Sequence, residues 1–461
     1  MIRALKGLIA QRNPLRLLWH RAKAFVAALR YGFSARTLMV IGITGTDGKT
    51  TTVGMVAHIL NETGIKAGAL STAFFQIGNK ITWNATQKTS PSPFTIQKFL
   101  KRCRDAGCTH VVLEYSSHGL VQHRMDYTWP QVAAITNTTP EHLDYHGTME
   151  QYREDKGILF RMLTGKGTKV LNVEDETIRT YRRIPAERAY AYSGGGQFSQ
   201  FPRGIAALLD GRILEGDPHH PQTTAMSNDD AFLWMTDLIV TPTSAKAKTH
   251  SVLGNSSEET ADLVLAIPGQ FNLENAACAI SCANAIGVPL AESARALATF
   301  KGVPGRMERI DAGQPFSVFV DFTVTPASYE KTLSTLKSAL SSGNRLLVLT
   351  GSCGDRMREK RPTIGKIVSS YADVMVVANE DPYTEEPERI IDEVWAGIDH
   401  AKTKAHRIFD RRKAIEFLLQ DAKSGDIVIL CGKGSDTTMW LKDGQIPWNE
   451  REIVLEILRS R

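Results

Sequence analysis

Acidic residues are absent from the first 46 positions of this 461-residue chain. The same stretch holds eight arginine and lysine residues, whereas the whole chain has a net charge of only +6. The remaining residues are therefore close to neutral in sum, which argues against a general nucleic-acid binder. The N-terminus is a basic segment attached to an otherwise balanced protein.

The sequence also lacks long apolar runs, paired cysteines and internal repeats. No stretch of about eighteen apolar residues occurs, so no membrane-spanning helix is predicted. The six cysteines form no C-x-x-C pair, which disfavours a zinc site or a disulfide framework and favours a reducing cytoplasm. A chain of 461 residues is expected to form two or three domains, each with its own core.

The spacing of residues 15–31 predicts an amphipathic helix. Its basic face holds Arg16, His20, Lys23 and Arg30, and its apolar face holds Leu15, Leu18, Trp19, Ala22, Val26 and Leu29. Such a helix either lies on an anionic membrane surface or a partner, or packs on its own catalytic domain with the basic face in solvent. We weigh these two alternatives equally. An organelle transit peptide is less favoured, because hardly any linker separates the helix from the first predicted strand.

The most informative motif is Gly45-Thr-Asp-Gly-Lys-Thr-Thr51, which directly follows the apolar run 38–43. A buried strand, a glycine-rich turn and a helix that opens with Lys and Thr are typical of a phosphate-binding loop, because backbone N–H groups and the helix N-terminus face the anion. Lys49 adds a positive charge and Thr50 can reach a magnesium ion. Ile43 stands where the common P-loop motif has glycine. The short form G-x-x-G-K-T therefore restricts the chain to fewer protein families than a general P-loop would.

Beyond this loop, strands and helices alternate, as in proteins with a parallel sheet. Helices are expected at 50–61 and 93–106, and strands at 109–114, 132–136, 316–321, 345–350, 373–378 and 426–430. A β-rich excursion is expected at about 190–260, and a domain linker around 302–305. The sequence therefore predicts two α/β domains, of which the second is doubly wound.

Polar residues follow several predicted strands, at the sheet edge where open α/β sheets bind ligands. Glu114 ends one strand, His142 follows another, and Lys156 lies in the next segment. A loop of the second domain has the sequence GSCGDRMREKRP over residues 351–362. Alone, each residue is better explained as a cap, a loop histidine or a solvated lysine. Their joint order behind a phosphate loop is what indicates a catalytic site.

With these blocks the chain resembles the Mur ligase family, most closely its MurE type, from about residue 37 to the C-terminus. The blocks that carry the resemblance are GTDGKTTT, EYSSHGLVQHR, TNTTPEHLDYHGTMEQYREDK, GQFNLENAACAI, GRMERID, GDRMREKRP and GKGSD. The resemblance implies a P-loop-type central ATPase domain with a parallel-rich sheet over 37–303. It also implies a C-terminal doubly wound, Rossmann-like ligase domain over 304–461, with the basic helix segment 1–36 in front.

The resemblance further implies ATP-dependent amide synthesis in peptidoglycan precursor formation, with Mg2+ as the metal. The carboxylate of a muramoyl peptide attacks the γ-phosphate, and the amine of a free amino acid displaces phosphate from the acyl phosphate. By similarity, Lys49 contacts the transferring phosphate, and Thr50 with Glu114 holds one magnesium ion. His142 helps to bind a second metal ion, and Lys156 matches the family lysine that carries a carbamate beside the metals.

The remaining site residues follow from the same resemblance. The residues implied to bind ATP are Gly45, Thr46, Asp47, Gly48, Lys49, Thr50, Thr51, Asn272, Asn275, Arg306 and Asp321. Those implied to contact the acceptor are Thr89, Ser90, Ser116, Gln122 and Arg124. Those implied to face the incoming amino acid are Arg356, Glu380, Asp381, Tyr383, Gly432 and Asp436. The expected location is the cytoplasm or the inner face of the cytoplasmic membrane.

Three departures from the family pattern carry expectations of their own. Residues 1–36 are too few for the N-terminal domain that usually binds the UDP group in this family. We therefore expect either that the uridine is bound differently or that the acceptor is not the usual UDP-linked form, for example a lipid-linked precursor. The family motif DNPR is Glu380-Asp-Pro-Tyr383 here, and tyrosine cannot pair bidentately with a distal carboxylate. Lysine or ornithine is therefore at least as well supported as diaminopimelate. Asp436 replaces a longer glutamate, and Val324 replaces a histidine near the nucleotide.

Several functions compete with an active MurE-type ligase, which is favoured. A related ligase with a folate-polyglutamate or polyamide acceptor is disfavoured by the block SSHGLVQHR. A non-catalytic nucleotide-binding paralogue is disfavoured because the predicted catalytic residues, Lys49, Glu114, His142 and Lys156, are all present. A plain ATPase or small-molecule kinase comes last, since neither needs the loop GDRMREKRP.

Overall fold

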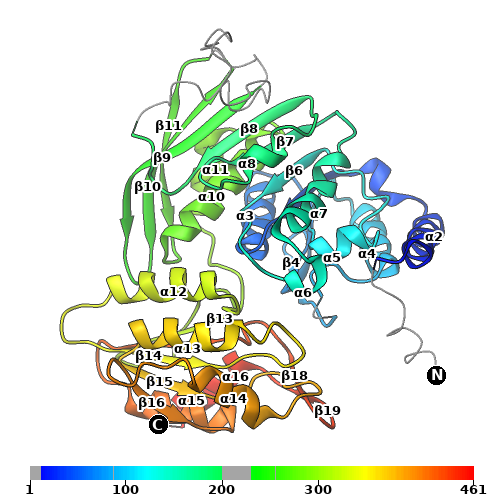
Figure 1. The fold of residues 1–461 in the computed structure, drawn as a ribbon. Coiled ribbons are helices and arrows are strands. Elements are labelled where there is room, and N and C mark those ends of the chain that lie inside the picture. The colour runs from blue at the N-terminus through cyan, green and yellow to red at the C-terminus, as the bar shows by residue number, and fades with distance from the viewer. Residues whose placement is uncertain (1–11, 87, 200–229, 255, 461) are drawn as a thin grey trace, which may run out of the picture. The chain divides into compact units, whose positions relative to one another are not determined.

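A computed structural model describes residues 12–86, 88–199, 230–254 and 256–460. The chain divides into two compact units, with the main boundary between Phe300 and Lys301. Two short segments, 240–244 and 267–269, belong to the second unit although they lie earlier in the chain. Figure 1 labels the elements of both units.

The first unit is built on one eleven-stranded sheet. Its strands are β1 (Met39–Thr44), β2 (Ala67–Leu70), β3 (Phe74–Ile77), β4 (Lys80–Trp83), β5 (His110–Glu114), β6 (Val132–Ile135), β7 (Thr168–Asn172), β8 (Arg188–Ser193), β9 (Ala231–Val240), β10 (Ala245–Leu253) and β11 (Glu259–Leu265). Its helices are α2 (Pro14–Arg30), the 3-10 turn η1 (Ser34–Thr37), α3 (Lys49–Glu62), α4 (Pro93–Asp105), α5 (Ser117–Val121), α6 (Leu143–His146), α7 (Met149–Arg161), α8 (Ile178–Tyr181), α10 (Gln270–Asn284) and α11 (Leu290–Leu297).

The strand order of this sheet is β11-β10-β9-β8-β7-β6-β1-β5-β2-β3-β4. The neighbouring strands in the run β9-β8-β7-β6-β1-β5-β2 are parallel. At one edge β3 pairs antiparallel with β2 and with β4, and at the other edge β10 pairs antiparallel with β11. Strand β1 lies between β5 and β6, where the order of the strands reverses. The loops after these three strands therefore meet at the position where open α/β sheets bind ligands.

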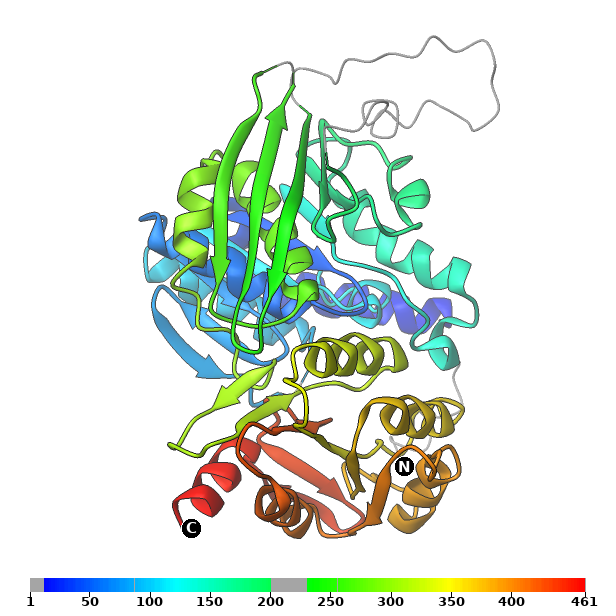
Figure 2. The same cartoon turned by 90° about the vertical axis from the view of Figure 1, so that its left-hand side faces the viewer.

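Helices cover both faces of the sheet (Figures 1 and 2). Alternate strand residues point to opposite faces. On one face, Val40 of β1 and Leu113 of β5 share a core with Phe99 of α4 and Phe160 of α7. Helices α3 and α10 pack on each other, and both contact strands of the sheet. The apolar runs that predicted these strands are thus buried from both sides.

The second unit is a smaller doubly wound domain. Its strands are β12 (Glu308–Ile310), β13 (Ser317–Asp321), β14 (Leu346–Thr350), β15 (Val374–Val377), β16 (Lys404–Arg407), β17 (Ile427–Cys431), β18 (Thr438–Leu441) and β19 (Gly444–Pro447). Its helices are α12 (Pro326–Ser338), α13 (Lys360–Tyr371), α14 (Pro387–Trp395), α15 (Arg411–Asp421) and α16 (Glu450–Arg459). Six strands form a sheet in the order β12-β13-β17-β14-β15-β16, parallel except for β12, and β18 pairs with β19 in a separate hairpin.

The predicted fold class is confirmed, because both units are α/β and the larger sheet is mostly parallel. Four strands predicted in the second domain occur within about one residue of their expected bounds. Strands β8 to β11 lie in the expected β-rich excursion, whose residues 200–229 fall outside the described part of the chain. Strand β16 escapes prediction, since the edge segment Lys404-Ala-His-Arg407 has no apolar run.

Helix α2 corrects one expectation about the N-terminal segment. The helix packs against α4, and its buried residues are Ala24, Ala27 and Ala28. The predicted apolar face is the exposed one, with Leu15, Leu18 and Trp19 showing 77%, 63% and 67% of their surface. Three residues of the predicted solvated basic face, Arg16, His20 and Lys23, are half-buried, and only Arg30 of that face is exposed. Small alanines permit the close approach to the domain and leave the large apolar side chains outside.

In the part of the chain that the structure describes, no helix has the length and apolar character needed to cross a membrane.

Candidate active site

The phosphate loop connects β1 to α3 at the reversal point of the first sheet. Gly45 and Gly48 have φ angles of +148° and +81°, which side chains rarely permit. A Cβ atom on Gly45 would lie 1.9 Å from Thr136 Oγ1, and one on Gly48 would lie 2.2 Å from Asn275 Oδ1. Both glycines are therefore required by backbone conformation and by space.

The segment after β6 holds this loop in place. The backbone N–H of Thr46 donates to the carbonyl of Asn137 at 2.9 Å, and that of Asp47 donates to Asn137 Oδ1 at 3.0 Å. The Thr136 hydroxyl donates to the Asp47 carbonyl at 2.6 Å. Thr136 and Asn137 are missing from the predicted site residues, although their position at the carboxyl end of β6 is a signal that could have found them.

Glu114 ends β5 and is almost completely buried. One of its oxygens accepts from the Thr50 hydroxyl at 3.0 Å and from the Thr72 backbone N–H at 2.7 Å. Its other oxygen accepts from the Thr72 hydroxyl at 3.0 Å. The structure thus brings together Thr50 and Glu114, two predicted magnesium ligands, and adds Thr72, which was not predicted. Hydroxyl and carboxylate oxygens are the hard donors that magnesium prefers.

Two lysines flank the phosphate loop and bind successive carbonyls of it. Lys156 Nζ donates to the Gly45 carbonyl at 2.6 Å, and Lys49 Nζ donates to the Thr46 carbonyl at 2.6 Å. Burial, and after it the charge of Lys49, lowers the pKa of Lys156 well below its ordinary value. The Lys156 amine is therefore biased towards its neutral, nucleophilic form.

His142 lies in a separate cluster of aromatic rings. Its backbone is left-handed, with φ at +56°, a strained conformation that is uncommon for residues other than glycine. Its ring packs edge-to-face on His118, with 4.8 Å between centroids. Within the described ranges, no group of three or more His, Cys, Asp or Glu side chains is arranged to hold a metal ion. The role of His142 at a second metal stays a prediction.

Two predicted nucleotide residues, Asn272 and Asn275, are buried on α10 behind the loop. Asn275 Nδ2 donates to Asn272 Oδ1 at 3.2 Å, and Asn275 Oδ1 accepts from the Thr52 hydroxyl at 3.4 Å. Because Thr52 belongs to α3, this pair is tied to the helix that the phosphate loop opens.

The five predicted acceptor residues form a network that begins at Glu114. The Thr72 hydroxyl, which donates to the Glu114 carboxylate, also lies within hydrogen-bonding distance of the Thr89 hydroxyl, at 2.8 Å. The Ser90 hydroxyl donates to the Glu114 carbonyl at 3.4 Å and accepts from the Ser116 N–H at 3.0 Å. Ser116 in turn caps α5 with its side chain.

The network continues through Arg124 towards the aromatic cluster. The Arg124 guanidinium donates to the Ser90 carbonyl at 2.8 Å and to Gln122 Oε1. Gln122 Nε2 donates to the Tyr145 hydroxyl at 3.2 Å. The sequence blocks around residues 89, 116 and 124 therefore converge on one surface beside the predicted magnesium carboxylate.

In the second unit, Arg306 and Asp321 lie near each other across β12 and β13. The Asp321 carboxylate accepts from the Met307 N–H at 2.6 Å, and burial raises the pKa of Asp321. The Arg306 guanidinium stacks over the Phe322 ring at 4.3 Å and donates to the Phe322 carbonyl at 3.3 Å. The backbone is again left-handed at Met307, with φ at +45°.

The residues predicted to face the amino acid gather at the carboxyl ends of β14, β15 and β17. Glu380 accepts from the Cys353 thiol at 2.9 Å, and burial raises the pKa of this glutamate. A Cβ on Gly432 would lie 2.3 Å from Glu380 Oε2, so glycine is required there. Lys433 Nζ donates to both oxygens of Asp381, at 2.9 and 2.8 Å, and to Asp436 at 3.1 Å.

Tyr383 stands where the family motif has arginine, and another arginine covers it. The Arg356 guanidinium lies 5.3 Å from the centroid of the Tyr383 ring. The same ring packs on Trp440, with 5.6 Å between centroids. Trp440 in turn donates its backbone N–H to Asp381 at 2.8 Å. The six predicted residues of this group therefore belong to one local cluster.

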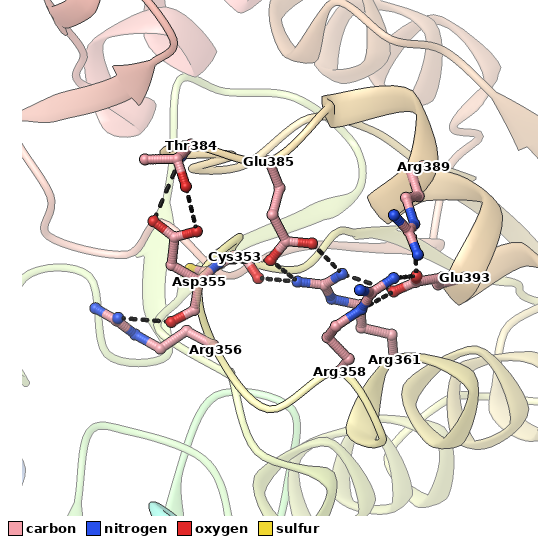
Figure 3. A network of polar contacts seen from close by, with 9 residues as sticks. All are labelled: Cys353, Asp355, Arg356, Arg358, Arg361, Thr384, Glu385, Arg389 and Glu393. Carbon is pink, nitrogen blue, oxygen red and sulfur yellow. Dashed lines mark hydrogen bonds and ion pairs between the residues drawn. The ribbon is translucent and has the colours of Figure 1, made fainter. Parts of the chain in front are cut away.

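The loop that carries Arg356 is held by a network of ion pairs, shown in Figure 3. Arg361, whose side chain is fully buried, binds Glu385 at 2.8 and 3.0 Å and Glu393 at 2.6 Å. It also donates to the Cys353 carbonyl at 3.0 Å. Glu385 accepts in addition from the Asp355 N–H at 2.7 Å. Arg361 thus joins both ends of the loop to α14, a role that the motif letters alone do not reveal.

The fold and this loop define the chain as a nucleotide-binding α/β protein with a phosphate loop at the reversal point of its sheet. Comparison with known proteins makes the class more specific. A profile of the Mur ligase middle domain matches residues 43–204, and one of the Mur ligase glutamate ligase domain matches residues 305–434.

Individual relatives agree with these profiles. The UDP-N-acetylmuramyl-tripeptide synthetase of Roseiflexus sp. (strain RS-1) is 34% identical over 93% of this chain and 80% of its own. A UDP-N-acetylmuramoyl-L-alanyl-D-glutamate--2,6-diaminopimelate ligase of Syntrophomonas wolfei is 32% identical over 95% and 82%. A solved structure of a ligase of that name superposes with a TM-score of 0.57 at 26% identity, covering 92% of this chain and 78% of the other. The chain belongs to the Mur ligase family. It is accordingly an ATP-dependent, ADP-forming amide ligase.

Replacing Gly48 by alanine should abolish ATP binding. The new Cβ would collide with Asn275 and displace the phosphate loop, on top of a backbone cost of roughly 1–2 kcal/mol at positive φ. Gly64→Ala is the matched control, because Gly64 has φ at +83° but nothing within 4 Å of its Cβ position. Calorimetric titration with ATP checks both. Equal affinities of the two variants would contradict the assigned geometry.

The ion pairs of Arg361 should make the second unit sensitive to acid. The Arg361 guanidinium lowers the pKa of Glu385 from 4.5 to about 2. Because the folded-state pKa is depressed, the stabilisation is complete above about pH 4.5 and disappears as the pH falls towards 2. Glu385→Gln should therefore lower the melting temperature at pH 7, and its deficit should shrink on acidification.

Thermal unfolding followed by circular dichroism between pH 3 and pH 7 measures this deficit. Glu386→Gln is the control, since the adjacent glutamate is exposed and pairs with the exposed Lys442. If Glu385→Gln lowers the melting temperature by the same amount at every pH, the assigned link between the Glu385 pKa and stability is ruled out.

Proposed function

We propose that this chain joins an amino acid to the terminal carboxylate of a muramoyl peptide at the expense of ATP, in peptidoglycan precursor synthesis. The observation that carries the proposal is the continuous network from the phosphate loop through Thr50, Glu114 and Thr72 to the acceptor residues Thr89 and Ser90. This network supports a proposed phosphate site that adjoins a proposed site for a carboxylate-bearing acceptor. The names of the relatives, which refer to UDP-N-acetylmuramoyl substrates, support the same acceptor.

The reaction has two steps. An oxygen of the acceptor carboxylate forms a bond to the γ-phosphorus, and ADP leaves with the electrons of the broken P–O bond. The neutral amine of the amino acid then attacks the acyl carbon, and inorganic phosphate leaves as the amide forms and the amine loses a proton. Both steps gather negative charge on phosphate oxygens, so preorganised cations and backbone N–H groups are the main source of acceleration.

The first unit supplies these groups. The N–H groups of the loop and of the first turn of α3 would bind the phosphates, with Lys49 at the transferring phosphate. Thr50 and Glu114 would hold Mg2+ together with phosphate oxygens of ATP, an arrangement that suits a site with few protein ligands. The ion, when bound, neutralises charge on the phosphates. Arg124 would orient the anionic groups of the acceptor beside Ser90 and Ser116.

Lys156 would carry a carbamate as part of this site. Its neutral amine attacks the carbon of CO2, an N–C bond forms, and one amine proton leaves to solvent, so that a neutral buried amine becomes an anion. The depressed pKa of Lys156 favours this step, because only the unprotonated amine is nucleophilic. An anion also relieves the repulsion between Lys156 and Lys49 beside the loop.

The added amino acid is proposed to be a diamino acid such as lysine or ornithine. Tyr383 replaces the arginine that would pair with a distal carboxylate, so a diamino acid without that carboxylate suits the site. The six cysteines are all free, which fits a reducing compartment, and the reaction needs ATP. Both points support a location in the cytoplasm. Work at the inner face of the cytoplasmic membrane belongs to the same proposal.

Product profiling with the purified chain tests this function. ATP, Mg2+ and UDP-muramoyl-dipeptide would be combined with lysine, ornithine or diaminopimelate, and the products identified by mass spectrometry. Wild type should form a ligated product, and Lys49→Ala should lose it by about 100-fold or more. Lys166→Ala, at an exposed lysine away from the loop, should leave the rate unchanged. The absence of any ligated product over this panel and lipid-linked acceptors would refute the proposal.

The carbamate makes activity dependent on CO2. Degassed enzyme should lose most of its activity and recover it with bicarbonate, and a carbamate carbon should appear by NMR after labelling with 13C-bicarbonate. Lys156→Arg should lack both the labelled signal and the bicarbonate response, because a guanidinium does not form the carbamate. Full activity of degassed enzyme together with an absent signal would show that Lys156 acts as a plain lysine.

A further inference from the structure

A row of large apolar side chains runs along the outer side of helix α2. We call it the outer stripe: Leu15, Leu18, Trp19, Phe25, Val26 and Leu29. Their exposed fractions range from 46% to 77%. Their spacing of three and four residues places them on one face of the helix. An exposed row of this size on one helix is unusual in a water-facing surface and marks an interaction site.

The opposite side of α2 is fixed to the domain. Its alanines are buried, and the helix packs against α4. Burial lowers the pKa of His20, and the positive charges of Arg16 and Arg124 lower it further. Ahead of the helix, Arg12 pairs with the buried Asp155 of α7. The outer stripe therefore faces outward from a helix that is anchored along its inner side by α4 and just before its N-terminus by the Arg12 ion pair.

The charges on α2 are all positive, and those on the supporting helix α4 are mostly positive. Helix α2 contains no acidic residue, and Arg21 and Arg30 are exposed on it. The supporting helix α4 adds Lys98, Lys101, Arg102 and Arg104, against the single acid Asp105, which already pairs with two of these cations. Arg104 also reaches to within 3.9 Å of a Cβ position on Gly32, just after α2. The surface that borders the stripe is thus cationic.

We propose that the outer stripe docks this chain onto an anionic lipid bilayer. The helix lies in the plane of the interface, its large apolar side chains enter the region below the headgroups, and the bordering arginines and lysines contact the anionic headgroups. Trp19 suits this position, because an indole ring is favoured at a membrane–water interface. The inference concerns binding alone and does not rest on the proposed ligase reaction.

Charge decides against the other occupants of the stripe. A second copy of the chain would bring two acid-free, cationic helices together, and like charges across an interface are unfavourable. Residues 1–11 also contain Arg3 and Lys6 and no acid, so the same objection applies to them. An anionic bilayer satisfies both the apolar stripe and its basic border.

Flotation of the full chain with vesicles tests this inference. The vesicles would contain phosphatidylcholine alone or with one third phosphatidylglycerol. Wild type should float with the anionic vesicles only, and increasing salt should release it because the headgroup contacts are screened. Trp19→Glu should reduce vesicle partition about tenfold or more. Trp83→Glu is the control, because Trp83 is 46% exposed in the same unit but lies on β4.

Two further measurements separate docking from misfolding and from self-association. Trp19→Glu should keep the wild-type melting temperature and, with a soluble acceptor, the wild-type ligase rate. Arg30→Glu should reduce partition into anionic vesicles about fivefold or more. Failure of wild type to float, or equal flotation of Trp19→Glu, would overturn the inference. A dimer in sedimentation that Trp19→Glu abolishes, without vesicle binding, would assign the stripe to a second copy.

Discussion

The fit of the phosphate loop against the strand end behind it is the constraint on which the candidate site depends. Two glycines leave no room for a side chain between the loop and its neighbours Thr136 and Asn275. That contact brings residues from β1, β6 and α10 into one place, although they lie up to about 230 positions apart in the chain. Lys156 then closes the loop by binding its first carbonyl. The proposed sites for phosphate, magnesium and the acceptor all border this arrangement.

Buried charge is the second theme, and each instance has a partner or a shifted pKa. Glu114 is satisfied by two threonines, and Lys433 by two aspartates. Lys156 instead donates to the Gly45 carbonyl, and burial lowers its pKa. A buried amine whose charged form is disfavoured is costly in stability, so its presence beside a phosphate loop is better explained by chemistry than by folding.

The sequence predicts the regular parts of the fold well, because apolar runs and a glycine-rich turn are local signals. Strand β1, the loop and helix α3 follow from residues 38 to 62 alone. Thr72 could not be predicted in this way, since its bond to Glu114 spans 42 positions. The face that α2 presents to solvent also depends on tertiary packing, because an amphipathic pattern gives two faces without saying which one the domain covers. The roles of the site residues were predicted from the resemblance to the Mur ligase family. The fold adds that residues distant in the sequence lie close together.

The central claim is that the acceptor carboxylate is activated by direct attack on the γ-phosphate. Its most direct test is a single turnover with an acceptor whose terminal carboxylate is labelled with 18O, followed by mass spectrometry of the released inorganic phosphate. If an acyl phosphate forms, one labelled oxygen must appear in that phosphate for each amide made. Label recovered in AMP, or phosphate free of label while amide accumulates, would contradict the account.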